Sequence, residues 1–180
     1  TDTFAVTSSD GGTSQTITIT ITGVNDAATF GGATTGGATE DTSDASGTAT
    51  VTDTDTGQST FTAVSTETAS VSGYGTYTIT SGGVWAYTLT DSNSAVQALA
   101  AAATMSDTFA VTSSDGTSQT ITITITGADD TSVWAGTTSG SLTEDDSTTT
   151  ATGPLTISDA DDGESPTITD VSSTAGANGY

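Results

Sequence analysis

A Thr-Ile alternation of the length of one strand occurs twice in this chain, each time after an Asp-Gly turn. Residues 15–22 and residues 119–126 both read Gln-Thr-Ile-Thr-Ile-Thr-Ile-Thr. A period of two places the isoleucines on one face of a β-strand and the threonines on the other, so we expect a buried isoleucine face. The copies lie 104 residues apart, which is the length of a domain rather than of a solenoid turn. The sequence therefore predicts a row of similar β-domains.

The negative charge of the chain excludes several classes of binding partner. The 180 residues include 22 Asp and Glu but no Lys, Arg or His, which gives a net charge of −22. Nucleic acids and anionic membranes are bound through Lys and Arg, so both are excluded as partners, and no apolar run is long enough for direct membrane insertion. Cysteine is absent, which excludes disulfides and thiolate chemistry. Any cation that neutralises clustered carboxylates must come from outside the chain.

The apolar residues outline one complete domain. Low hydrophobicity with high net charge is typical of disorder, but here the apolar residues gather in short alternating runs between turn residues, which favours a folded β-protein. Strands are predicted at 3–7, 16–22, 47–52, 73–79, 84–89, 109–111 and 121–125, and a further strand is predicted to begin within 61–64. About seven strands in roughly 100 residues are typical of an immunoglobulin-like β-sandwich.

Two stretches of this domain depart from the strand pattern. Residues Ala95–Ala101 are predicted to form a short helix that buries Val96 and Leu99, with candidate N-caps just before it. Residues Gly31–Gly37 are rich in glycine and polar, so we expect irregular structure there. The fold class is therefore all-β, with tandem sandwich repeats and one short helical turn per repeat.

The repeat divides the chain into three parts. Residues 1–26 are predicted to be the C-terminal hairpin of a partial repeat with its linker, residues 27–130 a complete repeat, and residues 131–180 the N-terminal half of a further repeat. In the last part Trp134 takes the position of Phe30. Because the chain starts inside a repeat, we expect it to belong to a longer polypeptide.

Two segments carry a resemblance to a known family. Residues 85–99 read Trp-Ala-Tyr-Thr-Leu-Thr-Asp-Ser-Asn-Ser-Ala-Val-Gln-Ala-Leu, and residues 107–117 read Asp-Thr-Phe-Ala-Val-Thr-Ser-Ser-Asp-Gly-Thr. These residues resemble the VCBS repeat, a cadherin-like β-sandwich of very large bacterial surface adhesins of the RTX type. The resemblance implies extracellular tandem rods, exported by a dedicated one-step secretion system, that hold a cell to a surface or to other cells.

The resemblance also implies Ca²⁺ at the junctions between repeats. The acidic residues fall where cadherin-type domains keep calcium ligands, in the linkers, near the start of each repeat, in the Asp-x-Asp loops and before the last hairpin turn. One departure from the family pattern is Leu99-Ala100-Ala101-Ala102, where cadherins carry acidic residues. We therefore expect fewer ions per junction, about one, held mainly by Asn25, Asp53, Asp55 and Asp115. The full set of candidate metal ligands is Asn25, Asp26, Glu40, Asp41, Asp53, Asp55, Asp115, Asp129, Asp130, Glu144, Asp145, Asp159 and Asp161.

A metal also has a physical rationale in these loops. Calcium takes six to eight oxygen ligands, and Asp-x-Asp-x-Gly brings two carboxylates together. Two carboxylates about 5 Å apart repel each other by roughly 3 kcal/mol at an effective dielectric of 20. The alternative is a solvated turn, but two copies of the pattern beside acidic linkers favour a metal. For Glu40 and Asp41 both interpretations stay open, whereas Asp2 and Asp107 are expected on the strand surface.

The aromatic residues leave a second alternative. Trp85, Tyr74, Tyr77 and Tyr87 could form a sugar-stacking platform, but their alternate positions on strands favour a core role. An enzyme is not expected, because the chain has no His, Cys or Lys to serve as base or nucleophile, and its carboxylates lie in loops.

The sequence as a whole predicts a function. We expect a non-catalytic, calcium-rigidified spacer of an extracellular bacterial adhesin or biofilm matrix protein at the cell surface, whose partners are the neighbouring repeats of the same chain. The alternatives are a filament subunit joined to other copies of itself by strand complementation, and a glycan-binding module.

Overall fold

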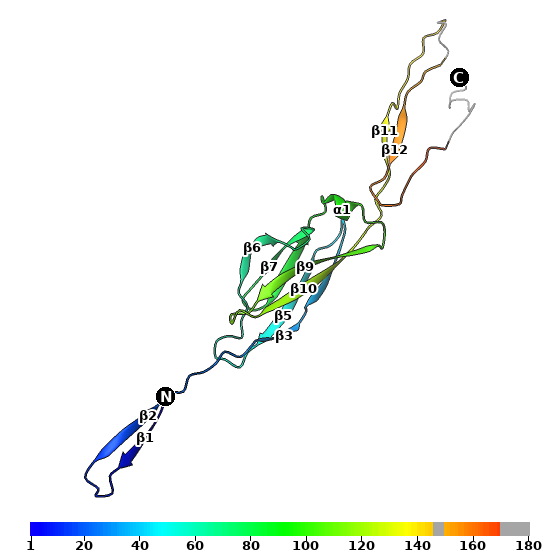
Figure 1. The fold of residues 1–180 in the computed structure, drawn as a ribbon. Coiled ribbons are helices and arrows are strands. Elements are labelled where there is room, and N and C mark those ends of the chain that lie inside the picture. Colours follow the sequence, from blue (N-terminus) through cyan, green and yellow to red (C-terminus); the bar gives the residue numbers. More distant parts are fainter. Residues whose placement is uncertain (146–149, 170–180) are drawn as a thin grey trace.

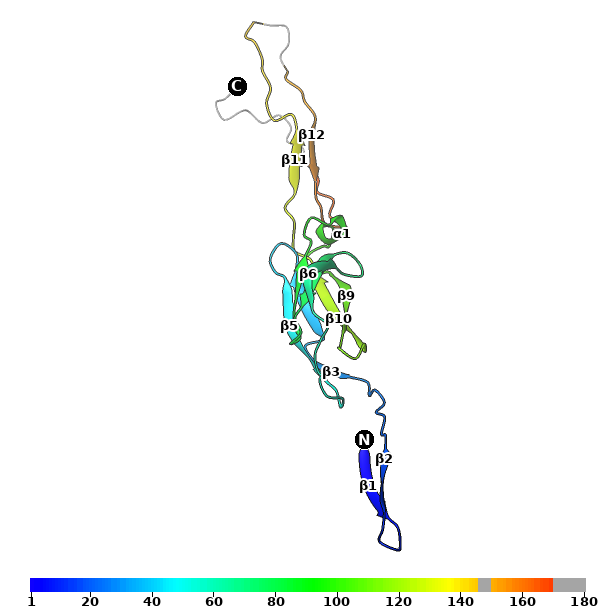
Figure 2. The same cartoon turned by 90° about the vertical axis from the view of Figure 1, so that its left-hand side faces the viewer.

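The computed structural model describes residues 1–145 and 150–169, which form a sandwich with one hairpin beyond each end (Figures 1 and 2). The strands are, in chain order, β1 (Asp2–Thr7), β2 (Ser14–Ile19), β3 (Thr29–Gly32), β4 (Thr35–Thr39), β5 (Ala45–Thr52), β6 (Val64–Ala69), β7 (Gly75–Ile79), β8 (Val84–Leu89), β9 (Thr104–Thr112), β10 (Ser118–Thr126), β11 (Val133–Gly136) and β12 (Leu155–Ser158). The described residues contain one helix, α1 (Ser94–Gln97). The predicted all-β fold class, with one short helical turn in the complete repeat, is confirmed.

Two sheets make up the sandwich. One has five strands in the order β3-β5-β8-β7-β6, and the other has three in the order β4-β10-β9. Strand β4 pairs in parallel with β10, whereas β10 and β9 form an antiparallel hairpin. Strands β3 and β4 therefore belong to different sheets, and the short segment between them carries the chain from one layer to the other.

The prediction of irregular structure over Gly31–Gly37 is wrong, because this segment contains the end of β3 and most of β4. The glycines serve close packing. A Cβ atom on Gly36 would lie 2.7 Å from Cη2 of Trp85, and one on Gly47 would lie 2.6 Å from its Cζ2. Glycine here marks a strand that passes directly over an indole ring, a role that glycine has in strand interiors.

The core confirms the predicted orientation of the strands. The isoleucines of β10 are fully buried between threonines that are exposed or half-buried. Trp85 and Tyr87 on β8 are also fully buried, and both rings pack against Phe109 at centroid distances of 5.9 and 6.3 Å. Trp85 Nε1 donates a hydrogen bond of 2.8 Å to the carbonyl oxygen of Ala33. The aromatic residues of β8 are thus core residues rather than a sugar platform.

Two predicted elements differ from the structure. The helix is shorter than predicted, because the chain leaves the helix after Gln97 and adopts a positive φ of 62° at Ala102. Its N-cap is Asn93, whose side chain accepts a hydrogen bond from the backbone of Ala95. The strand predicted to begin within 61–64 starts at the end of that stretch, as β6 at Val64, whereas Phe61 forms only an isolated bridge and its ring fills the core.

The hairpin β1–β2 shows what the second sheet does for burial. It repeats the sequence of β9–β10, yet Phe4 is 51 % exposed where Phe109 is 1 % exposed, and Ile17 is 38 % exposed where Ile121 is fully buried. No sheet faces β1–β2 among the described residues. The same strands therefore expose their apolar face when no opposing layer is present.

The hairpin β11–β12 repeats the pairing of β3 with β5. Trp134 pairs with Ile157 as Phe30 pairs with Val51. Residues 146–149 and 170–180 of the predicted third repeat lie outside the described residues. The boundaries predicted for the three repeats stay predictions.

Asp107 corrects another expectation. It was expected on the surface of its strand, but it is fully buried between the sheets. The carboxylate accepts hydrogen bonds from Tyr87 Oη at 2.9 Å and from the backbone N–H groups of Ser72 at 3.0 Å and Thr108 at 2.7 Å. Ser70 Oγ also donates to it. Alternation along β9 places Asp107 on the same inward face as Phe109 and Val111, and donors from the opposite layer make the burial of its charge possible.

These contacts also explain the acidity of Asp107. Burial by itself raises the pKa of the Asp107 carboxyl, but the hydrogen bonds from Ser70, Ser72, Tyr87 and Thr108 outweigh burial and leave the pKa below its ordinary value of 3.8. Burial, together with the hydrogen bond to Asp107 and its charge, raises the pKa of Tyr87, so the phenol stays a donor.

Replacing Asp107 with Asn is expected to destabilise the sandwich by about 3 kcal/mol, since an amide cannot accept from every buried donor. The folded pKa of Asp107 is lowered, so its contribution is complete above the unfolded pKa and falls as the pH drops through the folded pKa. The difference between wild type and D107N, measured by urea unfolding, should therefore narrow below pH 4. The exposed Asp91→Asn variant is the control. Equal stability of D107N and wild type at pH 7 would contradict this account.

Replacing Gly36 with Ala is expected to destabilise the protein by about 2 kcal/mol, because the new methyl group overlaps the ring of Trp85. Gly37→Ala is the matched control, since its Cβ would have only an ordinary contact of 3.9 Å with Thr124 O. Urea unfolding followed by tryptophan fluorescence measures both variants. If both had the same stability, the packing role of Gly36 would be wrong.

Candidate metal centres at the repeat junctions

Acidic loops lie at both ends of the sandwich, where a linker meets the loop that follows β5 or the loop that follows β12. We define the first junction as Asn25, Asp26, Asp53, Asp55 and Gln58. We define the second junction as Glu40, Asp129, Asp130, Asp159, Asp161 and Glu164. The first junction follows hairpin β1–β2, and the second lies between α1 and hairpin β11–β12 (Figure 1).

The first junction is held by backbone donors. The N–H of Asp26 in the linker donates to Asp55 Oδ2 at 2.8 Å, and the N–H of Asp55 donates to Asp53 Oδ1 at 2.7 Å. Asn25 is exposed, and its Nδ2 donates to the carbonyl oxygen of Asp26. The loop and the linker are thus joined through carboxylate oxygens on the loop.

The second junction repeats this arrangement. The N–H of Asp130 donates to Asp161 Oδ2 at 3.0 Å, and the N–H of Asp161 donates to Asp159 Oδ1 at 3.1 Å. Ser132 Oγ donates to Asp159 Oδ2 at 2.8 Å. In the first junction Ala28 stands at the position of Ser132, so the corresponding oxygen of the Asp-x-Asp loop has no hydroxyl donor there.

A compact group of carboxylates forms in the second junction. One carboxylate oxygen from each of Asp129, Asp161 and Glu164 lies within 4.8 Å of the others. Asp161 is only 3 % exposed, whereas Asp129 and Glu164 reach solvent. Three negative groups at this separation repel one another strongly unless a cation joins them.

Four buried side-chain oxygens in the two junctions have no hydrogen-bond partner. They are Asp53 Oδ2 and Gln58 Oε1 in the first junction, and Asp130 Oδ2 and Asp161 Oδ1 in the second. Buried acceptors are almost always satisfied in folded proteins, so such a group requires an explanation. An all-oxygen set of carboxylates and carboxamides is the donor set that a hard divalent cation prefers. The residues present therefore fit a metal ion of this class.

The acidities in the second junction follow from this crowding. Burial raises the pKa of Asp130, and the carboxylates of Asp41, Asp161, Asp159 and Asp129 raise it further. Burial also raises the pKa of Glu164, with contributions from Asp159, Asp129 and Asp161. No Lys, Arg or His exists in the chain to offset this repulsion.

Glu40 is the fully buried carboxylate of the second junction. Its Oε1 accepts from Gln97 Nε2 at 3.1 Å, and its Oε2 accepts from the N–H of Ala128 at 3.1 Å. Burial raises its pKa, the hydrogen bond from Ala128 opposes this effect, and Asp130 adds to it. Glu40 thus lies close enough to sense the charges of the junction, while both of its oxygens already have protein donors.

Asp115 differs from the other predicted ligands. Its Oδ2 accepts from the N–H of Ala28 at 3.0 Å and from Thr117 Oγ1 at 2.6 Å, and its Oδ1 accepts from the N–H of Thr117 at 2.9 Å and from Ser113 Oγ. Hydrogen bonds from Ser113 and Thr117 hold its pKa well below the ordinary value. This carboxylate closes the β9–β10 turn and fixes the end of the linker, so it has little capacity left for a metal.

The structure does not bring the remaining predicted ligands into one group. Asp41 is exposed, has a positive φ of 57°, and makes one long contact of 3.5 Å with Gln97. Glu144 and Asp145 lie in the loop between β11 and β12, at the opposite end of that hairpin from Asp159. Asp145 repeats the positive φ of Asp41, at 63°.

The sequence prediction missed Glu164, Gln58 and Gln97. Glu164 follows the glycine of the second Asp-x-Asp-x-Gly loop, and Gln58 follows the glycine of the first. Alignment of the two loops carries this signal, because both positions hold a side chain with a terminal oxygen. Gln97 carried no local signal, since only the fold places α1 beside Glu40.

A backbone hydrogen bond also crosses the second junction. The N–H of Asp162 donates to the carbonyl oxygen of Ala98, directly after α1, at 2.9 Å. The loop between residues 98 and 103 is in turn bound to the end of the sandwich, through Ala102 N to Gly127 O at 3.1 Å and Gly127 N to Ala103 O at 2.9 Å. The helical turn therefore connects the sandwich to the acidic loop that follows β12.

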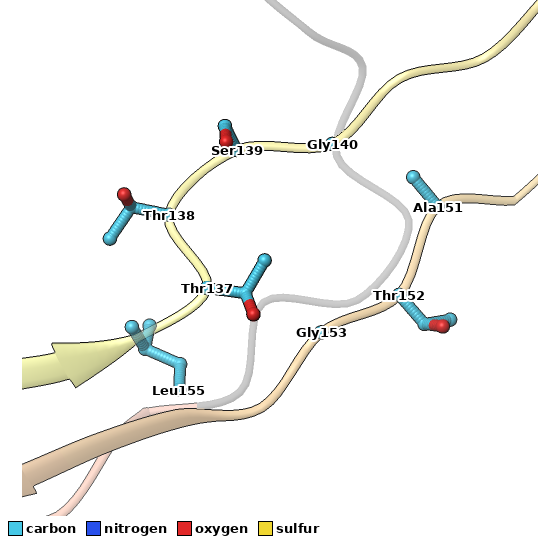
Figure 3. A pocket seen from close by; sticks show the side chains of 8 residues that line it. All are labelled: Thr137, Thr138, Ser139, Gly140, Ala151, Thr152, Gly153 and Leu155. Carbon is cyan, nitrogen blue, oxygen red and sulfur yellow. The ribbon is translucent and has the colours of Figure 1, made fainter.

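A cavity lies inside the long loop of hairpin β11–β12, and Figure 3 shows its lining. It is formed by Thr137, Thr138, Ser139, Gly140, Ala151, Thr152, Gly153 and Leu155. Gly140 and Gly153 stand at the positions of Gly36 and Gly47, which enclose the ring of Trp85 in the sandwich. The cavity corresponds to the place of a core tryptophan, and its lining has no titratable side chain suited to catalysis.

Comparison with known proteins gives one family match. A family model described as a bacterial cadherin-like domain matches residues 25–127, which include the whole sandwich and more than half of the chain. A search of curated proteins finds no match. Within residues 1–145 and 150–169, no helix is long and apolar enough to cross a membrane.

Proposed function

We propose that this chain, which belongs to the bacterial cadherin-like domain family, is a non-catalytic spacer of an extracellular rod whose junctions between repeats are stiffened by Ca²⁺. Domains of this family are generally structural modules and are typically extracellular. The cadherin-like part of the resemblance is confirmed by the family match, whereas the assignment to VCBS repeats of RTX-type adhesins stays a proposal.

One observation carries the calcium proposal. Asp161 is 3 % exposed, its Oδ1 has no hydrogen-bond partner, and it lies in a group with Asp129 and Glu164. A buried, unpaired carboxylate oxygen costs several kcal/mol unless a cation approaches it. The chain has no side-chain cation, so the ion comes from the medium.

Residues of the second junction supply both the ligands of the proposed calcium site and the groups that orient them. Asp129, Asp161 and Glu164 would hold the ion in the second junction, with Asp130 Oδ2 as a further free acceptor. When bound, the ion supplies two positive charges that offset the repulsion between the carboxylates. The N–H of Asp130 orients Asp161 by donating to its Oδ2, which leaves Oδ1 free.

The same residues come from both sides of the linker between the sandwich and hairpin β11–β12. Asp129 and Asp130 follow β10 at the end of the sandwich, whereas Asp161 and Glu164 follow β12 of the next hairpin. Ligands from both sides of a linker restrict its rotation when they share one ion. Stiff junctions keep a row of sandwiches extended, which is the requirement of a spacer that carries a distal tip away from a cell surface.

The environment outside a cell is consistent with this role. Calcium sites of extracellular modules have dissociation constants near 10⁻⁴ to 10⁻³ M, so partly exposed junctions of modest affinity suffice there. A net charge of −22 keeps neighbouring rods apart in solution. We propose a bacterial adhesin or biofilm matrix protein at the cell surface as the parent of this chain, and its own neighbouring repeats as its main partners.

One observation favours filament formation by strand complementation as a second candidate. Hairpin β1–β2 exposes an apolar face, including Phe4, Val6 and Ile19, that another copy could cover. Among the described residues, the two hairpins correspond to β9–β10 and to β3–β5, which are four of the eight strands of the sandwich. The spacer is therefore the preferred proposal. Full burial of Trp85 and Tyr87 gives the glycan-binding alternative no support.

Calcium is expected to raise the melting temperature of the 180-residue chain. A ligand at 100 times its Kd stabilises the folded state by about 2.7 kcal/mol, which corresponds to a shift on the order of 10 °C. Asp161→Asn should lose most of this shift in calcium, yet be at least as stable as wild type in chelator, because it removes one repelling charge. Differential scanning calorimetry measures both conditions.

The matched control for this prediction is Glu67→Gln. Glu67 is exposed on β6 and loses the same charge, so this variant should keep the full calcium shift. A melting temperature of the wild type that is equal in calcium and in chelator would refute calcium binding at the junctions.

Calcium is also expected to change the shape distribution of the chain. Small-angle scattering should show a narrower and longer distance distribution in calcium than in chelator, because the ion restricts the linker between the sandwich and β11–β12. Asp161→Asn should show the chelator profile under both conditions. If the wild-type profiles coincide while calcium still raises the melting temperature, the ion binds but does not stiffen the junction.

A further inference from the structure

The two junctions have the same backbone framework. In each Asp-x-Asp loop the second aspartate donates its N–H to the first, at 2.7 Å from Asp55 to Asp53 and at 3.1 Å from Asp161 to Asp159. In each, the second aspartate accepts from the linker, at 2.8 Å in the first junction and 3.0 Å in the second. The two loops therefore present their side chains in the same way.

The turn that follows each loop is also the same. Gly57 and Gly163 have positive φ angles of 85° and 88°, which place the next side chain on the same side of the loop. The N–H of Gln58 donates to the carbonyl oxygen of Asp55 at 3.3 Å, and the N–H of Glu164 makes the equivalent bond at 3.2 Å. Gln58 is thus the structural counterpart of Glu164.

The chemistry at the equivalent positions differs. The group of three carboxylates in the second junction has two carboxamides and one carboxylate as its counterparts in the first. The pairs are Asp129 and Asn25, Asp161 and Asp55, and Glu164 and Gln58. All six side chains end in an oxygen ligand, so geometry is kept while the formal charge of the group falls from −3 to −1.

We propose that the two junctions bind calcium unequally, the second tightly and the first weakly, with Glu164 and Asp129 as the residues that set the difference. This inference rests on the proposed function and specifies how the affinity for calcium differs between the two junctions. The second junction also carries a nine-tenths-buried carboxylate, Asp161, whose Oδ1 has no partner. In the first junction the free oxygens include the neutral Gln58 Oε1.

The number of charged ligands is a main determinant of the calcium affinity of an all-oxygen site. The affinity of protein calcium sites varies over several orders of magnitude with the number of charged ligands and the rigidity of the site. The backbone framework of the two loops is shared, so the charge of the three ligands is the variable that differs between them. We expect the Kd for calcium to rise about tenfold for each carboxylate that is replaced by a carboxamide, and about a hundredfold when both are replaced.

This grading has a mechanical consequence. At calcium concentrations between the two dissociation constants, the second junction holds its ion while the first does not. The rod then has one stiff joint and one free joint on either side of the same sandwich. Calcium would thus tune the number of stiff joints rather than switch the whole rod at once.

Isothermal titration calorimetry of the full chain with calcium chloride tests the proposal. The wild type is compared with a double variant of each junction, D129N/E164Q and N25D/Q58E, and single D161N and D55N variants assign each Kd to a junction. Glu40 and Asp41 add negative charge on the sandwich side of the second junction. A difference in Kd between the two wild-type sites is therefore not decisive by itself. The decisive comparison is the change in Kd that each double variant causes. Circular dichroism in chelator confirms that each variant is folded.

The two double variants are expected to change the calcium affinity of their junctions in opposite directions. D129N/E164Q should weaken the tight site by about a hundredfold, and N25D/Q58E should strengthen the weak site by a similar factor. If both double variants bind calcium with wild-type constants, the unequal-junction proposal is overturned while calcium binding stands. If the wild type takes up no calcium, the proposed function itself is overturned.

Discussion

Each carboxylate of this chain has to be stabilised without a side-chain cation. With 22 acidic residues and no Lys, Arg or His, ion pairs between side chains are impossible. The structure instead surrounds its inner carboxylates with hydroxyl and backbone donors. Asp107 and Asp115 each accept at least four hydrogen bonds, and both have lowered pKa values. The abundance of Ser and Thr in this chain thus has a structural use, because hydroxyl groups replace the missing cations.

The junctions are the places where this solution is incomplete. Asp161 and Asp130 have buried oxygens without donors, and Asp130 and Glu164 have raised pKa values. Inside the sandwich the same chain satisfies Asp107 fully, so the deficit at the junction is local. In the described part of the chain, the buried side-chain oxygens without a partner all lie at the junctions, so the electrostatics of the fold depends on the geometry where two repeats meet. This dependence is the basis of the proposed calcium-stiffened spacer.

Packing supports this arrangement from within. The two sheets approach each other closely because Gly36 and Gly47 leave room for the ring of Trp85, and small residues such as Ala38 and Ala45 complete the layer. This close approach also brings donors from the loop after β6 to Asp107 on β9. Hairpin β11–β12 repeats the two glycines, as Gly140 and Gly153, and both line the cavity in its loop.

The sequence by itself determined the β-fold, the length of the repeat and the alternation of each strand, because a period of two in side-chain polarity is a local property. It also located the acidic loops, since Asp-x-Asp-x-Gly and the Asn-Asp or Asp-Asp linkers are contiguous patterns. Only the tertiary structure decided which of these residues meet. It separated Asp115, which is saturated by its own turn, from Asp161, which is left with a free oxygen. It also brought hydrogen-bond donors to Asp107, made strands of the glycine-rich segment and left Ile17 exposed although Ile121 is buried in an identical sequence. These outcomes depend on which layer lies opposite a residue, and contacts between residues far apart in the chain leave no trace in local periodicity.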